Sequence, residues 1–411
     1  MKRERAPRPS GLIVPLMRLV VLPFLIRRYR VSASGGLRAL RALPPPYIVL
    51  ANHVNYWDPF WISAFIRHPV QFVTSDNIFR EAFFGAAMRL VGSIPKTKLM
   101  NDSRTVRQIF GVRGNKGVIG IFPEGSRSYD GRSGPVIPAV ARLIRKLGIP
   151  VISATIAGGY LSRPRWARHV RRGRVQIQYR LLFSKDDLAR LSDDEVSEAV
   201  AQAIDFNEMD WQRKSLVRFR GRRPAEFLER LLFICPHCRS VSRLESRADR
   251  LTCMACGYQV RMNRLGFFEP RRGPLYFEDP AKWNAWQLPV LQGMLAETGR
   301  PGQPIFEERP TLLLRGYRDR PLRVVSHGSA ALMRDRILFY PNAGGPRSFF
   351  HSKIRGMNVQ NGEKLEFYYD NALFRLDFRS ARASPYKWTK TVEILAGTDP
   401  QARSLIRVNT Y

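Results

Sequence analysis

Short runs of β-branched and aromatic residues alternate with amphipathic stretches between residues 44 and 209. Strands separated by helices usually join into one sheet whose faces the helices cover. We therefore expect an α/β domain with a central sheet flanked by helices. The candidate strands are Tyr47–Ala51, Val70–Thr74, Gly117–Phe122, Val151–Ile156 and Arg174–Phe183. The candidate helices are Pro59–Ile66, Ala82–Val91, Ser103–Val112, Pro135–Leu147 and Asp193–Met209.

The pattern changes near residue 305, where short apolar segments follow one another closely with turn residues between them. Such spacing is typical of antiparallel strands. We expect a β-rich, barrel-like domain over 305–411 that includes a late amphipathic helix, Pro385–Leu395. Its candidate strands are Leu312–Leu314, Leu322–Val325, Ala330–Met333, Ile337–Tyr340, Leu365–Tyr369 and Leu373–Phe378. The element order resembles pleckstrin-homology or GRAM-type modules, which implies a protein or lipid partner; a packing or oligomerisation domain is the alternative.

The four cysteines of the chain form two pairs, Cys235-x2-Cys238 and Cys253-x2-Cys256, separated by fourteen residues. Two such pairs can place four thiolates around one tetrahedral zinc ion. We therefore expect a zinc-ribbon-like segment over 226–268 that holds a structural zinc. A redox dithiol is the alternative, but it would require only one pair.

The chain is strongly basic, with 68 Lys and Arg against 34 Asp and Glu and a formal net charge of +34. Such a charge favours polyanionic partners, which include anionic membrane surfaces, phosphorylated substrates and nucleic acids. Arginines gather in two stretches, residues 163–174 and 213–223. A solvated face is the simplest interpretation of these stretches, and contact with anionic lipid headgroups is the other.

The first 43 residues combine a basic arm with an apolar stretch from Gly11 to Ile26. Two prolines and Arg18 interrupt this stretch, which is unlike a signal peptide. A helix of this length would rise about 24 Å, which is less than the roughly 30 Å of a bilayer core. We expect an interfacial amphipathic helix rather than a membrane span. A helix packed on its own domain is the alternative.

A histidine and an aspartate lie close together after the first candidate strand, as His53 and Asp58 in Asn52–Pro59. Asp followed by Pro favours a helix start, which places His53 in the turn between strand and helix. Such a corner can fold the carboxylate back onto the imidazole, which would then act as a general base. Alternatively, Asp58 caps the helix and His53 is an ordinary turn residue.

Three further segments contain residues that could bind a phosphate-bearing ligand or support its binding site. Phe122-Pro-Glu-Gly-Ser-Arg-Ser128 follows a strand, at the end of a sheet where α/β proteins place ligands, and includes a guanidinium suited to phosphate. Gly92-Ser-Ile-Pro-Lys-Thr-Lys98 presents two cations after a tight turn. Ile149-Pro-Val-Ile152 is the entry to a strand and reads as core.

In this order, the four segments resemble the glycerolipid acyltransferase family, typified by the 1-acylglycerol-3-phosphate acyltransferases. The resemblance covers about the first half of the chain, and its most specific motifs are NHVNYWD and FPEGSRS. Lys98 stands where the family usually has arginine, so a bidentate donor is replaced by a point charge. No nucleophile elbow, phosphate loop or dinucleotide fingerprint competes with this resemblance.

The resemblance implies roles for individual residues. His53 would deprotonate the acceptor hydroxyl and Asp58 would orient it, with no catalytic cofactor and no covalent enzyme intermediate. The acyl donor would be acyl-CoA or acyl-carrier protein. The residues implied in substrate binding are Glu124, Gly125, Arg127, Lys96 and Lys98.

The leading hypothesis is a cytoplasmic, peripheral membrane acyltransferase that acylates a lysophosphatidate-like hydroxyl on an anionic membrane surface. One alternative is an acyltransferase for another lysophospholipid, an amine or a specialised lipid. Another is a non-catalytic protein that binds membranes or nucleic acids. The expected organisation is an arm and helix over 1–43, an acyltransferase domain over 44–225, the zinc-ribbon-like segment over 226–268, a linker over 269–304 and the β-rich domain over 305–411.

Overall fold

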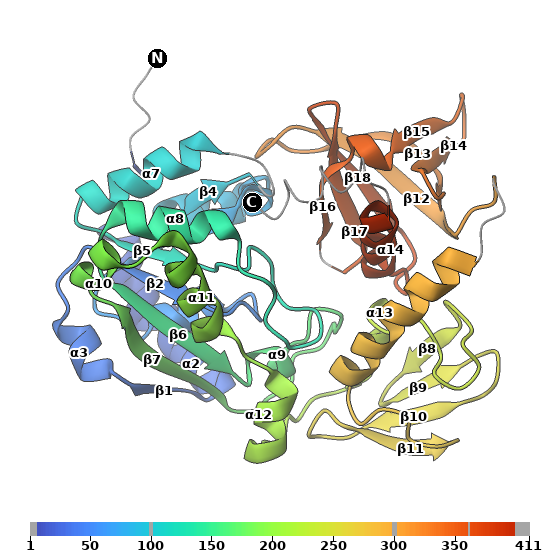
Figure 1. Cartoon of the computed structure of the whole chain (residues 1–411), viewed down its shortest axis with the longest axis horizontal. Helices are drawn as coiled ribbons and strands as arrows, with labels where there is room; N and C mark the ends of the chain where they lie inside the picture. Colours follow the sequence, from blue (N-terminus) through green and yellow to red (C-terminus); the bar gives the residue numbers. More distant parts are fainter. Residues whose placement is uncertain (1–5, 98–101, 298–301, 361, 399–411) are drawn as a thin grey trace. The chain divides into compact units, whose positions relative to one another are not determined.

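The computed structural model describes residues 6–97, 102–297, 302–360 and 362–398, and Figure 1 shows its course. The chain divides into two compact units. Met1–Pro164 and Arg171–Arg220 form the first unit, and Arg165–Val170 and Gly221–Thr410 form the second. No helix among the described residues has both the length and the apolar character needed to cross a bilayer.

The first unit is built on a seven-stranded sheet with the order β1-β7-β6-β2-β5-β3-β4. Its strands are β1 Val31–Gly35, β2 Tyr47–Ala51, β3 Val70–Ser75, β4 Ile94–Lys96, β5 Val118–Ile121, β6 Val151–Ala157 and β7 Val175–Phe183. The five strands from β6 to β4 run parallel, whereas β7 is antiparallel to β6. Every residue of β2 is buried, as expected of a central strand covered on both faces.

Helices cover this sheet, so the expected α/β architecture is present. They are α1 Ile13–Leu16, a π-helical turn Met17–Val21, α2 Leu22–Tyr29, α3 Leu37–Ala42, α4 Asp58–Ser63, α5 Asp76–Phe79, α6 Ala82–Leu90, α7 Ser103–Gly114, α8 Pro138–Leu147, α9 Gly159–Ser162, α10 Lys185–Arg190, α11 Asp193–Ile204 and α12 Glu208–Ser215. Apolar residues of α7, α8, α10 and α11 form one core with β2, β5 and β6. On these strands, burial of apolar area is the main stabilising contribution.

One expected helix, Asp193–Met209, is interrupted. Ser133 binds the backbone where α11 ends. Its hydroxyl donates a hydrogen bond to the Ile204 carbonyl, and its amide donates one to the Phe206 carbonyl. Asn207 then caps α12 by accepting the backbone N–H groups of the first turn. The loop after β5 therefore ends this helix, which is a tertiary effect that local propensity does not contain.

The second unit contains a four-stranded antiparallel sheet with the order β11-β10-β9-β8. Its strands are β8 Leu244–Arg247, β9 Arg250–Cys253, β10 Gln259–Met262 and β11 Phe268–Arg272, and the 3-10 turn Leu228–Arg230 precedes them. The segment expected to be a linker contributes helix α13, Pro280–Glu297. This helix is an integral part of the unit, because Trp283 donates to the Ile234 carbonyl and Gln287 accepts the Phe233 amide.

The same unit contains a second, seven-stranded antiparallel sheet with the order β15-β14-β13-β12-β18-β17-β16. The strands are β12 Phe306–Gly316, β13 Arg323–Leu332, β14 Arg336–Pro341, β15 Arg347–Phe350, β16 Arg355–Gln360, β17 Lys364–Tyr369 and β18 Ala372–Phe378, with a 3-10 turn His351–Lys353 and the helix α14 Pro385–Thr398. Trp388 and Val392 of α14 complete its core. The sheet curls into a half-barrel, the coarse form of the expected barrel-like domain.

Two expectations for this sheet were wrong in detail. One strand, β13, includes most of the two segments Leu322–Val325 and Ala330–Met333. Gly328 lies between them and continues the strand at a point where a Cβ would lie 2.0 Å from the Tyr340 carbonyl oxygen. The strands β15 and β16 were not expected, since neither has a run of β-branched residues.

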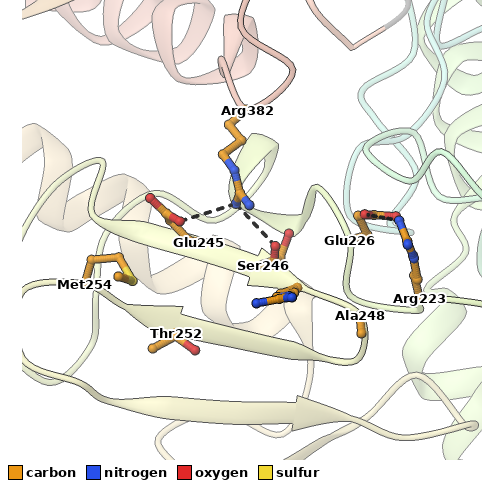
Figure 2. A pocket seen from close by; sticks show the side chains of 9 residues that line it. Arg223, Glu226, Glu245, Ser246, Ala248, Thr252, Met254 and Arg382 are labelled. Atoms are coloured by element: carbon orange, nitrogen blue, oxygen red, sulfur yellow. Dashed lines mark hydrogen bonds and ion pairs between the residues drawn. The ribbon is translucent and has the colours of Figure 1, made fainter.

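An arginine joins the loop before α14 to the four-stranded sheet, as Figure 2 shows. Arg382 donates to the Glu229 carboxylate at 2.7 Å and to the Ser246 carbonyl at 3.2 Å, and it lies 3.8 Å from Glu245. Burial raises the pKa of Glu229, an effect that the Ser246 hydroxyl and Arg382 oppose. A hollow of about 590 Å³ lies beside this arginine, and its wall contains both arginines and glutamates. Arginines and glutamates of this wall form ion pairs with one another, so the hollow marks a junction between segments of the unit.

Candidate active site

The candidate site lies where three neighbouring parallel strands end. In the order β6-β2-β5, the strand ends lead into Gly158–Arg163, Asn52–Asp58 and Phe122–Ser128. Parallel strands present their carboxyl ends at the same edge of a sheet, and α/β proteins commonly bind ligands there. Ile149–Ile152 lies instead at the start of β6, so this motif contributes to the core as expected.

The His53 and Asp58 side chains are paired. Nδ1 of His53 lies 2.8 Å from Oδ2 of Asp58, and the same oxygen accepts the backbone N–H groups of Val54 and Asn55 at 2.7 and 2.8 Å. Asp58 is the first residue of α4, and its side chain turns back toward the strand rather than forward along the helix. The arrangement matches the paired interpretation rather than the capping one, and it leaves Nε2 as the nitrogen that can accept a proton.

Aromatic stacking holds the imidazole in place. The His53 and Phe122 rings lie 4.0 Å apart at 18°, and Phe72 stacks behind Phe122 at 5.4 Å. The His53 side chain retains 21% exposure, whereas Asp58 has none. The base can therefore meet a ligand while its partner is shielded from water.

Burial is the dominant influence on the carboxyl group of the pair. It raises the pKa of Asp58 to about 8, against the opposing effects of the Asn55 and Val54 amides and of Arg127. One oxygen of Asp58, Oδ1, is buried without a hydrogen-bond partner. The Asp58 carboxyl group therefore holds its proton more tightly than an exposed carboxyl group would.

Glu124 connects two loops through their backbones. Its Oε1 accepts the His53 amide at 2.7 Å, and its Oε2 accepts the Gly134 amide at 2.7 Å. Burial raises the pKa of Glu124 to about 8, with these two amides opposing the shift. Both oxygens are thus engaged in positioning the turn that carries His53, a role that the sequence did not suggest.

Gly125 makes the same turn possible. Its φ is +66°, and an added Cβ would lie 2.7 Å from Cδ1 of Ile137. Three residues further on, the Ser128 amide donates to the His53 carbonyl at 2.8 Å. The FPEGSRS segment therefore lies against the histidine turn, which only glycine at position 125 permits without strain.

Two arginines gather on one tyrosine beside the pair. The guanidinium carbon of Arg127 lies 3.5 Å from the Tyr56 ring centroid, and that of Arg163 lies 5.4 Å from it. Arg163 follows α9, after the end of β6, in a stretch expected to be a solvated or lipid-contacting basic run. The proximity of Arg163 to the site was missed, and its only sequence signal was its position shortly after a buried strand.

Two asparagines tie the histidine turn to β6. Asn52 exchanges hydrogen bonds with the backbone of Ile156 at 3.0 and 2.7 Å, and Asn55 donates to the Gly159 carbonyl at 2.9 Å. Both side chains are buried. They flank His53 in sequence, yet their supporting role is visible only once β6 is adjacent to β2.

Of the two lysines expected at the site, Lys96 lies among the described residues. Lys96 ends β4, which lies three strand spacings of about 4.8 Å from β2. Burial lowers the pKa of Lys96, and Asp102 and Asp76 oppose this shift. The structure therefore places Lys96 at the outer part of the sheet edge. Lys98 lies outside the described residues.

The basic stretch 163–174 is only partly a solvated face. Arg171 is buried, and burial lowers its pKa to about 10. Trp166 is also buried, and the Arg165 guanidinium donates to the Val359 carbonyl within the second unit. The interpretation of this stretch as a solvated face is therefore wrong for Arg171.

The first unit is similar to known proteins. Residues 36–157 match the family model described as Acyltransferase. Over 125 residues the chain is 26% identical to a chloroplastic 1-acyl-sn-glycerol-3-phosphate acyltransferase, BAT2, of Brassica napus, which covers 30% of this chain and 36% of that protein. Over 132 residues it is 24% identical to the chloroplastic enzyme LPAT1 of Arabidopsis thaliana, covering 32% and 36%. The chain thus spans about a third of the length of these curated relatives.

Among solved structures, the 1-acyl-sn-glycerophosphate acyltransferase PlsC of Thermotoga maritima is similar at 19% identity, with a TM-score of 0.40 and coverage of 49% of this chain and 83% of that one. The matches to the family model and the two curated relatives confirm the resemblance drawn from the sequence motifs. The first unit therefore carries a domain that matches the acyltransferase family model.

Proposed function

We propose that this acyltransferase domain moves a fatty acyl chain from a thioester to the hydroxyl of a lysophosphatidate-like lipid. The observation that carries the proposal is the 2.8 Å pairing of His53 with the buried carboxylate of Asp58, next to the arginines on Tyr56. The chemistry of the pair supplies a base, and the arginines supply an anion-binding surface.

The proposed reaction needs one base and no covalent enzyme intermediate. Nε2 of His53 takes the hydroxyl proton of the acceptor as the hydroxyl oxygen attacks the thioester carbonyl carbon. The tetrahedral intermediate then collapses, the carbon–sulfur bond breaks, and the thiolate leaves with the proton that the imidazolium returns. Asp58 stabilises the imidazolium and fixes the ring through Nδ1. The donor would be acyl-CoA or acyl-carrier protein.

The acceptor would be recognised through its phosphate. Arg127 is proposed to bind the phosphate, and Arg163 supplies a second planar donor on the same ring. Gly125 and Glu124 would act by shaping and holding the turn, as their contacts indicate. Lys96 and Lys98 would interact with a part of the ligand farther from the reacting hydroxyl.

An acceptor panel tests this assignment. With lysophosphatidate, lysophosphatidylcholine, monoacylglycerol and a long-chain amine as acceptors, kcat/KM should be about tenfold or more higher for lysophosphatidate, because only it presents a phosphomonoester. Arg127→Gln and Arg163→Gln should each raise the KM for lysophosphatidate about tenfold, since each removes a charged donor. The exposed Arg142 of α8 provides a matched control, Arg142→Gln. A preference for another acceptor that survives both substitutions would favour the alternative acyltransferase.

The non-catalytic alternative predicts different behaviour. A binding protein built on an inactive enzyme fold would consume no thioester with any acceptor. Salt-sensitive retention of DNA or RNA, without retention on anionic vesicles, would support it.

We also propose that the domain works at a membrane surface, in the cytoplasm, as a peripheral protein. The helical segment from α1 to α2 exposes Leu12, Leu16, Leu19 and Phe24, while Leu22 and Leu25 face the unit's core. One apolar exposed face flanked by arginines is typical of helices that lie in the headgroup region. The half-barrel of the second unit is proposed to recruit a lipid or protein partner.

The four cysteines are proposed to hold a structural zinc ion. Their Sγ atoms all lie within 4.8 Å of one another, with Cys235–Cys256 at 3.8 Å and Cys238–Cys253 at 3.7 Å. Four sulfurs at the usual zinc–sulfur distance of about 2.3 Å would be about 3.8 Å apart in a tetrahedron. These distances therefore suit zinc and are far longer than a disulfide bond.

The backbone around the cysteines also fits a bound metal. The amides of His237 and Cys238 donate to the Cys235 sulfur, and those of Ala255 and Cys256 donate to the Cys253 sulfur. Such amides stabilise thiolate ligands. When bound, zinc would supply a cross-link within the second unit.

Metal analysis tests the zinc proposal. The purified protein should contain one equivalent of zinc, and Cys253→Ser should lose it and lower the unfolding temperature, because metal binding stabilises small domains strongly. Ala255→Ser, at an exposed position in the same turn, is the matched control and should keep the metal. Metal-free protein with an unchanged unfolding temperature would contradict the proposal.

A further inference from the structure

A hollow of about 630 Å³ in the first unit lies apart from the residues of the candidate active site. One part of its wall is apolar and comes from the π-helical turn and α2, namely Leu19, Val20, Pro23 and Phe24. Leu19 is 78% exposed and Phe24 is 64% exposed. A wall of this kind is costly to leave in water and gains free energy when hydrocarbon covers it.

The remaining wall consists entirely of arginines, namely Arg27, Arg28, Arg30 and Arg172. Among the described residues, no carboxylate forms an ion pair with any of the four. Arg28 lies over the Tyr29 ring at 5.6 Å, and its Nη1 is buried without a hydrogen-bond partner. These charges therefore repel one another and leave at least one buried donor unsatisfied.

The local backbone places the arginines where the helix ends. Arg30 has a left-handed conformation and terminates α2. Arg172 is held by reciprocal backbone hydrogen bonds with Arg220 at 2.7 and 2.8 Å. Two separate segments of the unit therefore supply cations to one hollow, and backbone hydrogen bonds fix the second of them.

A ligand that combines an anion with hydrocarbon would satisfy both walls. Guanidinium groups prefer phosphate, which accepts paired hydrogen bonds from their planar donors. The apolar wall requires methylene groups adjacent to that phosphate. Such a ligand is an anionic phospholipid, with its phosphate at the arginines and the start of its acyl chain along Leu19 and Phe24.

We propose that this hollow seats one anionic phospholipid molecule of the bilayer. The inference rests on the proposed membrane association and not on the proposed acyl transfer. The seat lies on the helix that packs against α4, since the Tyr29 and Trp61 rings meet at 5.0 Å. A lipid held here would therefore anchor the bilayer next to the helix that carries Asp58.

Vesicle binding by the full chain carrying His53→Ala tests the seat without any turnover. The probes are phosphatidylcholine vesicles alone and the same vesicles with phosphatidylglycerol or phosphatidate. The variant Arg28→Gln/Arg172→Gln is compared with Arg38→Gln/Arg41→Gln, which removes the same charge from exposed positions on α3 outside the hollow. We expect the first pair to weaken binding to anionic vesicles at least about tenfold more than the second.

Equal losses in the two double variants would overturn the proposal, because diffuse attraction to the surface would then explain the binding. A second variant, Leu19→Ser/Phe24→Ser, alters only exposed side chains and should weaken vesicle binding while the protein stays folded. Inorganic phosphate, tested at matched ionic strength, distinguishes binding of a phospholipid from binding of a free anion. If phosphate alone raises the unfolding temperature as strongly as the vesicles do, and Leu19→Ser/Phe24→Ser has no effect, the seat belongs to a free phosphate and the proposal is wrong.

Acyl transfer gives an independent readout. With a short-chain acceptor dispersed below its micellar concentration, the Arg28→Gln/Arg172→Gln variant of the otherwise native chain should keep its turnover. If the native chain binds vesicles but transfers no acyl group, the proposed reaction is refuted and the proposed lipid seat is not. Loss of specific vesicle binding with transfer intact would do the reverse.

Discussion

Replacing His53 with alanine should lower kcat for acyl transfer by about 10²–10⁴-fold, because the acceptor hydroxyl then loses the base proposed to take its proton. The ring stacks on Phe122 and bonds to Asp58, so its nitrogen is already oriented before substrate binds. The measurement is thiol release from acyl-CoA with lysophosphatidate in anionic vesicles.

His68→Ala is the matched control for this substitution, since it removes another histidine of the same unit that lies outside the site. It should leave turnover and vesicle binding unchanged, and His53→Ala should also leave vesicle binding unchanged. Equal turnover by wild type and His53→Ala would show that His53 is not the base.

Replacing Asp58 with asparagine should lower kcat over a similar range, about 10²–10⁴-fold, because the imidazolium formed during transfer loses its carboxylate. The side chain would still be able to accept from the Val54 and Asn55 amides, so the turn should keep its course. A circular dichroism spectrum and unfolding temperature close to wild type would separate loss of chemistry from loss of fold.

The same pair sets the pH dependence. Burial raises the pKa of Asp58 to about 8, so this carboxyl group takes up a proton as the pH falls through that value. With Asp58 protonated, the imidazolium that forms when His53 takes the hydroxyl proton lacks its anionic partner. The transfer rate should therefore rise about tenfold per pH unit up to about pH 8 and level off above it.

Glu124→Gln serves as the control for this pH profile. Burial also raises the pKa of Glu124 to about 8, but its oxygens are occupied by the His53 and Gly134 amides. The limb near pH 8 should persist in Glu124→Gln and disappear in Asp58→Asn. A flat profile between about pH 6 and pH 9 in the wild type would contradict the assignment.

The elements that form the candidate site could be predicted from sequence. The strands Tyr47–Ala51 and Val151–Ala157 are short, almost fully buried segments that contain β-branched residues, and their length and composition indicate strands. The His53 turn and the FPEGSRS turn each follow such a run. Since parallel strands align their carboxyl ends, a parallel sheet brings the two turns to the same edge, and the pairing of β2 with β5 places them side by side.

The supporting contacts of the site could not be predicted, because they join segments that are distant along the chain. The Glu124 carboxyl group accepts hydrogen bonds from the backbone N–H groups of residues 53 and 134. The sequence alone does not indicate which backbone N–H groups a carboxyl group will bind. Arg163 was placed in a basic stretch, but the order β6-β2-β5 puts it next to Tyr56. Strand order is a tertiary property, so local patterning could not distinguish this arginine from its neighbours.

The errors in the fold have similar origins. Leu322–Val325 and Ala330–Met333 were expected to be separate strands, yet Gly328 between them is a point where a neighbouring backbone approaches too closely for any side chain. The Pro280–Glu297 helix lies in the segment expected to be a linker. Its anchoring groups are buried polar groups of Trp283 and Gln287 that bind the backbone of residues 231–234. Such contacts stabilise a helix without contributing to its hydrophobic periodicity.

The central claim is that the His53–Asp58 pair directs an acyl group from a thioester to a lipid hydroxyl. It is tested most directly by mass spectrometry of the products formed by the full-length protein from acyl-CoA and lysophosphatidate in anionic vesicles. The account predicts one new acyl ester on the acceptor for each thiol released. Thiol release accompanied by free fatty acid, with the acceptor unchanged, would show that water rather than the lipid hydroxyl is the nucleophile.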